Sequence, residues 1–423
     1  MSTPLPRHQR GAAALGVTLM LLFVLAMVVG MAHRNLLFEQ RSSANQLRST
    51  RAFEAADAGL EWAQALLNRG GAIGADCALA SAAPGDKPFR ERFLAWDAAN
   101  GQFAPRTWAA PGGPTALQAA CVATDEGWAC SCPTDAVPDP AAPEGSAVRP
   151  AFVVGFVAAP RAGMVEVAVT GCDHFGPACQ GASAGEAGAT LHATLALLPA
   201  LASVPSAALT ARGAIESDAT MTLANQDEAS AGFTARAGGA IALPAADLVT
   251  LPGRSGPDSL AALDPALAAL DAERLLTRLL GVDRARWQQL PGVRSVDCSA
   301  DCAAALAAST APEQGASSML WVTGDLALEG PAAIGSAEKP LLIVVEGQVR
   351  LQGDVTIHGA IVTLAATWDT SGSTGAQVHG ALVALGDVRG DGTPTLVRDP
   401  AVLARLHGEI GHFTRVAGSW RDF

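Results

Sequence analysis

The sequence predicts a mixed α+β protein with a long N-terminal helix, a small antiparallel sheet, and a C-terminal β-helix-like solenoid with a helical insertion. Three observations predict it. An uncharged N-terminal run continues directly into a segment with one apolar stripe. Short alternating segments then follow in the middle of the chain. Short sequence motifs with glycine at the expected turns recur near the C-terminus at a spacing of about 20 residues.

The composition excludes several classes of protein. The chain has 423 residues, which suggests two or three folding units. Apolar residues make up 49% and charged residues 16%, so the chain is not a disordered polyelectrolyte. The net charge is -12, and the only lysines are Lys87 and Lys339. No basic patch with interleaved aromatic residues is present, and we therefore expect no nucleic-acid partner.

The N-terminus contains a candidate membrane span. Residues 1–11 are polar and include Arg7 and Arg10, and residues 12–32 contain neither charge nor proline. Such a run is long enough to cross a bilayer as a helix, and the positive charge before it keeps the N-terminus inside. Three interpretations remain open. They are a cleaved secretory signal ending near residues 30–32, a plain signal anchor, and a short leader that ends at Gly11.

The helix is predicted to continue to residue 69, over about 85 Å. Phe53, Ala56, Leu60, Ala63 and Leu67 form one apolar stripe at three- and four-residue spacing. The pair of glycines at residues 70–71 then ends the helix. A plain signal anchor does not need such an amphipathic extension.

The N-terminal segments together resemble a known family. The leader RHQRG, the apolar run AAALGVTLMLLFVLAM and the later stretch RAFEAADAGLEWA resemble the N-terminal domain of PilX-type minor pilins, which are components of type IV pilus assembly. The resemblance covers about the first 70 residues. It implies that a prepilin peptidase cuts between Gly11 and Ala12 and methylates Ala12.

One position departs from the pattern of major pilins. Those proteins carry Glu at the fifth mature position, where this sequence has Gly16. The resemblance implies that this Glu neutralises the N-terminal ammonium of a neighbouring subunit in apolar surroundings, where an unpaired charge is costly. Its absence favours a rare subunit at the tip or in an initiation complex over a bulk subunit. Tip pseudopilins of type II secretion systems also lack this Glu.

The resemblance implies a minor pilin-like component of type IV pilus biogenesis that acts in assembly initiation or at the tip through helix–helix packing. The expected partners are other minor pilins, the major pilin, prepilin peptidase and a large tip adhesin. The expected location is the inner membrane, crossed once, with a periplasmic body, or the pilus tip on the cell surface. The alternatives are a tip pseudopilin of a type II secretion system and an envelope-anchored β-solenoid that binds or cleaves a glycan.

All eight cysteines follow the apolar segment, and an even number on the exported side predicts disulfides. Cys172 and Cys179 lie between two strand candidates, and Cys298 and Cys302 are close enough for a local bridge. The four remaining cysteines allow three connectivities, which the sequence does not distinguish. They are Cys77, Cys121, Cys130 and Cys132. We expect Cys130 and Cys132 to pair with different distant partners.

The predicted units follow from these patterns. Residues 1–11 are a leader, residues 12–70 the helix, and residues 71–200 a loop and sheet domain with strands at 151–159, 164–170 and 190–198. Residues 201–256 form a first solenoid segment, residues 257–315 a helical insertion, and residues 316–423 the remaining solenoid with a C-terminal cap. A helix at 400–407 is expected to close the end of the solenoid, and Trp420 and Phe423 to pack against the body.

Internal repeats carry the solenoid prediction. IHGAIVTLA at 357–365 and VHGALVALG at 378–386 match at an offset of 21 residues. TARGAIES from residue 210 and TARAGGAI from residue 234 also resemble one another. Stacked coils bury the apolar side chains of such repeats, while an ordinary β-sandwich is the alternative.

The sequence contains little that suggests catalysis. It has no GxSxG, HExxH, Walker or EF-hand motif. His358 and His379 occupy equivalent repeat positions and are expected on a solvent face, with a metal site as the alternative. Asp387, Asp391 and Asp399 are expected in solvated loops. We therefore expect no enzyme activity, cofactor or metal.

Overall fold

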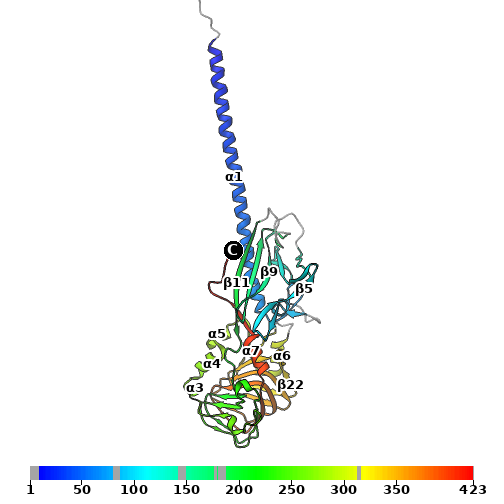
Figure 1. Cartoon of the computed structure of the whole chain (residues 1–423), viewed down its shortest axis with the longest axis vertical. Coiled ribbons are helices and arrows are strands. Elements are labelled where there is room, and N and C mark those ends of the chain that lie inside the picture. Colours follow the sequence, from blue (N-terminus) through cyan, green and yellow to red (C-terminus); the bar gives the residue numbers. More distant parts are fainter. Residues whose placement is uncertain are drawn as a thin grey trace, which may run out of the picture.

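The computed structural model describes residues 9–79, 86–141, 149–175, 179, 187–311 and 316–422. Residues 1–8 of the expected leader and Phe423 lie outside this description. A single helix, α1 (Gln9–Leu67), has 59 residues and is about 88 Å long. Its longer N-terminal part projects away from the body, and its C-terminal part, from about Arg48, packs against a sheet (Figure 1). The predicted long N-terminal helix is therefore confirmed.

The sheet that α1 covers has the strand order β30-β11-β10-β9-β7-β8, and all its neighbours are antiparallel. The three predicted strands are present as β9 (Ala151–Ala158), β10 (Met164–Cys172) and β11 (Gly188–Pro199). The other members are β7 (Ala119–Ala123), β8 (Trp128–Ser131) and β30 (Gly411–Arg415).

The buried stripe of α1 differs from the predicted one at its first position. Ala56, Leu60, Ala63 and Leu67 are buried as expected, within a core that includes side chains of β9, β10 and β11. Phe53 is instead 37% exposed, because it lies beside this stripe. The smaller residues Ala52 and Ala55 take its place against the sheet.

Glycines allow α1 to approach the sheet closely. A Cβ atom added to Gly171 of β10 would lie 2.1 Å from the Ala52 carbonyl oxygen and 2.3 Å from the Ala56 nitrogen. One added to Gly59 of α1 would lie 2.7 Å from side-chain atoms of Phe152 and Val169. Real Cβ atoms do not approach so closely, so both positions require glycine at this helix–sheet separation.

The segment between α1 and β9 forms short hairpins around one small helix, α2 (Phe89–Phe93). The hairpin pairs are β1 with β2, β3 with β4, and β5 with β6, all antiparallel. Their bounds are β1 (Ala72–Ile73), β2 (Lys87–Pro88), β3 (Leu94–Asp97), β4 (Gln102–Pro105), β5 (Thr107–Ala110) and β6 (Gly113–Ala116).

The region after residue 200 consists mostly of short strands that pair in parallel. The 21-residue repeat appears directly as the register of β25 (Val355–Thr363) against β27 (Thr374–Ala384), where His358 lies opposite His379. The earlier repeat is offset by two residues from the aligned TAR letters, since Thr210 lies opposite Arg236. Parallel ladders in register are what stacked coils require, while the solenoid itself stays a prediction.

The strands of this region fall into two parallel-rich sheets. Their further members are β12 (Leu209–Ala211), β13 (Ile215–Glu216), β14 (Thr222–Ala224), β15 (Ala235–Ala237), β16 (Ile241–Ala242), β17 (Asp247–Val249), β18 (Leu260–Ala261), β19 (Val293–Asp297), β20 (Met319–Thr323), β21 (Leu326–Glu329), β22 (Ala332–Ile334), β23 (Leu341–Val345), β24 (Val349–Gln352), β26 (Thr367–Asp369), β28 (Asp387–Arg389) and β29 (Thr393–Arg398). Short 3₁₀ turns lie at η1 (Glu228–Ser230) and η2 (Pro257–Ser259).

In its described residues, the predicted helical insertion contains four α-helices as well as strands. The helices are α3 (Pro265–Ala268), α4 (Ala272–Leu280), α5 (Arg284–Gln288) and α6 (Cys302–Thr310). Aspartates cap all four, and each carboxylate accepts a hydrogen bond from a backbone N–H of the first turn. The same segment also contributes strands, because β18 and β19 pair in parallel with β15 and β20.

The C-terminus follows a different route from the predicted one. Helix α7 (Pro400–Gly408) was expected to close the end of the solenoid, but its residues Val402, Leu403 and Leu406 pack on the face formed by β25 and β27. The chain then returns to the first sheet, where β30 pairs with β11. Residues that the sequence assigned to a C-terminal cap therefore complete the N-terminal sheet, and the C-terminus lies beside α1 (Figure 1).

Candidate assembly interface on the N-terminal helix

Most of the exposed large apolar side chains of the described chain lie on the N-terminal part of α1. Every side chain from Ala13 to Arg51 is exposed, and the part of the helix before Arg48 projects away from the described body (Figure 1). Most of the large apolar side chains on it are more than half exposed, including Leu15, Met20 and Phe23. Apolar surface of this extent marks a membrane or protein contact. The helix is long and apolar enough to span a membrane.

Charge is absent from the apolar part of this surface and returns just beyond it. No residue from Ala13 to Ala32 is charged, and Arg34, Glu39 and Arg41 follow. Gly16 lies within the uncharged stretch, and apart from its chain neighbours and the adjacent backbone of α1 no described atom lies within 4 Å of the position that a Cβ atom would take. This level of the helix therefore offers no carboxylate to a neighbour. Gly11 and Ala12 belong to the helical backbone of α1, while their side chains lie outside the described part of the chain.

Two side-chain contacts hold α1 to the body at the point where the helix first reaches it. Arg48 forms an ion pair with Asp173, with 3.7 Å between the guanidinium nitrogen and the carboxylate oxygen. On the other side, the rings of Phe53 and Trp420 meet edge to face at 6.1 Å. Trp420 thus packs near the helix as expected, although its side chain remains 41% exposed. These contacts define the length of the free stem as residues 13–47.

A second set of contacts holds the lower end of α1 to the C-terminal strand. The Asn68 side chain donates to the Phe413 carbonyl at 2.9 Å and accepts from the Phe413 N–H at 2.6 Å. The Arg90 guanidinium donates to the carbonyl oxygens of Leu67, Glu409 and Gly411, at 3.0, 3.2 and 2.8 Å. Burial lowers the pKa of Arg90 to about 10, while nearby carboxylates oppose the shift. The sequence did not indicate this cluster, because Asn68 and Arg90 lie more than 300 residues from their partners in the C-terminal segment.

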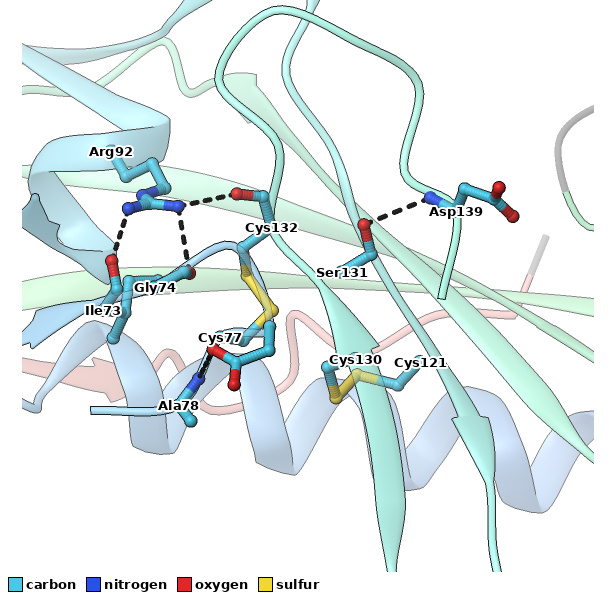
Figure 2. Close-up of a disulfide and its surroundings, with 11 residues drawn as sticks. Ile73, Gly74, Cys77, Ala78, Arg92, Cys121, Cys130, Ser131, Cys132 and Asp139 are labelled. Carbon is cyan, nitrogen blue, oxygen red and sulfur yellow. Dashed lines mark hydrogen bonds between the residues drawn. A yellow bond between two sulfur atoms is a disulfide. The ribbon is translucent and has the colours of Figure 1, made fainter. Parts of the chain in front are cut away.

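The cysteines are all paired in the described structure. Cys77 is bonded to Cys132 and Cys121 to Cys130, which selects one of the three possible connectivities. Cys130 and Cys132 thus have different partners (Figure 2). The two remaining bridges join neighbouring cysteines, Cys172 with Cys179 and Cys298 with Cys302. No free cysteine is found among the described residues.

Arg92 fixes the loop that the long-range disulfide crosses. Its guanidinium donates to the carbonyl oxygens of Ile73, Gly74 and Cys132, and the side chain is 6% exposed (Figure 2). Burial lowers the pKa of Arg92, and the Asp86 carboxylate opposes the shift. A buried cation thus binds three backbone carbonyl groups, one of which, that of Gly74, also accepts from the Cys77 N–H, and it ties the start of the loop region to the segment that follows β8.

The candidate metal residues do not form a multidentate cluster in the described chain. The rings of His358 and His379 stack at 5.0 Å, and no group of three or more His, Cys, Asp or Glu residues is arranged around a cation position there. Asp387 accepts from the Ala214 N–H, and Asp399 caps α7. Asp391 is exposed. The carboxylates of two of the three aspartates thus accept hydrogen bonds from backbone N–H groups.

Comparison with known proteins gives one family match over the N-terminal segment and one weak structural match. Residues 10–61 match the family model described as PilX N-terminal. Among solved structures, the competence-associated pilin ComZ from Thermus thermophilus aligns over 88% of this chain and 97% of its own, with 13% identity. Its TM-score of 0.21 is too low to establish a shared fold. No curated protein matches the chain. The family match covers the exposed stem and the first turns that enter the body, so this part of the chain is similar to the N-terminal domain of PilX-type pilins.

Proposed function

We propose that this chain is a minor pilin of type IV pilus biogenesis that acts in assembly initiation or at the pilus tip. The single observation that carries the proposal is the stem. An uncovered apolar helix presents Gly16 at the level where a bulk subunit carries a carboxylate. Helix–helix packing through this surface connects the chain to other minor pilins and to the major pilin. The missing carboxylate restricts it to positions where no neighbour requires that partner.

The same proposal places the chain in the inner membrane before assembly. Residues 12–32 cross the bilayer, and the body with its four disulfides lies in the oxidising periplasm. A prepilin peptidase removes residues 1–11 and methylates Ala12. The distal strand-rich region is farthest from the membrane and is the part that a large tip adhesin can reach (Figure 1).

The processing step is tested by sequencing the N-terminus of the mature protein, with and without prepilin peptidase. The expected start is Ala12 with the peptidase and a residue before Gly11 without it. Gly11→Leu is expected to block the cut, because a bulky side chain replaces the glycine next to the scissile bond, while Gly30→Leu should leave it unchanged. A mature start at another residue would contradict the pilin assignment.

The assembly role is tested at Gly16. Gly16→Glu supplies the carboxylate that the stem lacks, and we expect much more of this variant than of the parent in sheared pili. Gly16→Gln has the same shape without the charge and serves as the matched control. Equal incorporation of both variants would show that the missing charge does not limit entry. Deleting the protein should remove surface pili and leave protein secretion intact; the reverse outcome would favour a type II secretion pseudopilin.

A further inference from the structure

A cavity of about 190 Å³ lies beneath α4, against the outer face of β12 and β27. Leu275 and Leu279 of α4 and Val383 of β27 form apolar walls. The segment 203–206, which connects the first sheet to the strand-rich region, forms another side. An apolar cavity of about 150 Å³ in another protein holds a benzene molecule, so this space is large enough for a small organic ligand.

The wall formed by β12 carries a hydroxyl group without a partner. Thr210 lies between Leu209 and Ala211, which belong to the core on the opposite face of the strand. The residue is 7% exposed, and its Oγ1 atom is buried without a hydrogen-bond partner among the described atoms. A buried hydroxyl without a partner is costly, and a polar ligand atom in the cavity would satisfy it.

Two arginines line the cavity, and only one of them is paired with a carboxylate. Arg236 forms an ion pair with Asp264 and donates to the Ser206 hydroxyl at 3.1 Å, so its charge is already balanced. Arg278 extends from the exposed side of α4 and forms no ion pair with any residue in the described ranges. The cavity therefore combines apolar walls, a buried hydroxyl and one unbalanced positive charge.

We propose that this cavity binds a small amphipathic carboxylate, with an apolar group of about six to ten heavy atoms between Leu275, Leu279 and Val383. Arg278 pairs with the carboxylate, and the Thr210 hydroxyl meets a polar ligand atom. The ligand contacts α4, the connecting segment and β12 together. Binding is therefore expected to raise the melting temperature of the strand-rich region. This proposal is independent of the role of the stem.

The test uses the full-length protein in detergent, with 4-fluorobenzoate as the probe and 4-fluorobenzyl alcohol as its neutral counterpart, followed by fluorine NMR. The parent should bind the benzoate saturably. Arg278→Gln should weaken benzoate binding about tenfold and leave the alcohol unchanged, because only the benzoate carries a charge. Thr210→Val should weaken benzoate binding about fivefold, since it removes the hydroxyl and keeps the shape.

Arg274→Gln is the matched control, because Arg274 lies one turn earlier on α4, pairs with Asp271 and does not line the cavity. It should bind both probes as the parent does. Partitioning into detergent is common to all four proteins, so differences between them report the cavity. Absence of saturable benzoate binding by the parent overturns the proposal. Equal benzoate affinities of Arg278→Gln and Arg274→Gln, or of Thr210→Val and the parent, also overturn it.

Discussion

The position of α1 on the sheet depends on a missing side chain at Gly171, and Gly171→Ala tests this directly. The new Cβ atom would lie 2.1 Å from a carbonyl oxygen and 2.3 Å from a backbone nitrogen of α1. Neither atom can rotate away as a side chain can, so the helix must move. Overpacking of this kind costs about 3 kcal/mol, which is about a 100-fold change in the opening equilibrium.

Gly155→Ala provides the matched control in the same sheet. A Cβ atom at Gly155 of β9 would lie 3.5 Å from the nearest atom, the Nε2 atom of Gln118, which is an ordinary contact. Because alanine loses less backbone freedom on folding than glycine, this variant should be as stable as the parent or more stable by up to about 1 kcal/mol.

Hydrogen exchange of the full-length protein in detergent measures both effects in the relevant segment. In Gly171→Ala, the amides of residues 56–66 should lose protection by about 100-fold, while the free stem at residues 13–47 exchanges as in the parent. In Gly155→Ala, protection of residues 56–66 should be unchanged or greater. Equal protection in the two variants would refute the argument that backbone contact at Gly171 sets the distance between helix and sheet.

Three further predictions concern other parts of the fold. Asn68→Ala should destabilise the pairing of β30 by about 2 kcal/mol, measured by exchange at the Phe413 amide, with Asn68→Asp recovering part of the loss because it retains the acceptor. Replacing Cys77 and Cys132 by Ser should lower the free energy of unfolding by about 4 kcal/mol in denaturant titrations, since this bridge spans 55 residues. Burial, and after it the neighbouring His358 imidazole, lowers the pKa of His379 in the folded protein. Because the unfolded state binds this proton more readily, the free energy of unfolding should fall as the pH drops below about 6.5. His379→Gln should make the free energy of unfolding less dependent on pH in this range.

Elements with a local signal were predicted from the sequence, and elements that depend on distant partners were not. The helix, the strands β9 to β11 and the 21-residue register follow from periodicity within short windows. The pairing of β30 with β11 joins residues 411–415 to residues 195–199, and nothing in either segment identifies the other. The predicted apolar stripe wrongly included Phe53. Periodicity identifies apolar residues of any size, whereas close contact between a helix and a sheet requires small residues such as Ala52.

The same limit applies to the candidate interface. Gly16 and the uncovered stem could be identified from the sequence, because they depend on local composition. The disulfide connectivity could not, because Cys130 and Cys132 are two residues apart and only the hairpin geometry directs their side chains to different partners. The cluster of Asn68 and Arg90 also required the structure, since its acceptors are backbone carbonyls of the C-terminal segment.

This cluster has a consequence for the strand-rich region. The chain passes between the first sheet and that region near residue 200, and it returns near residue 410 through α7 and β30. Arg90 connects this returning segment to α1, because it donates to the Leu67 carbonyl at the end of the helix and to the carbonyls of Glu409 and Gly411 just after α7. A second covalent crossing, fixed by backbone hydrogen bonds, restrains rotation that a single linker would permit. The fold therefore restrains the orientation of the strand-rich region relative to the stem at two chain crossings, one through β30 and one through the connecting segment near residue 200.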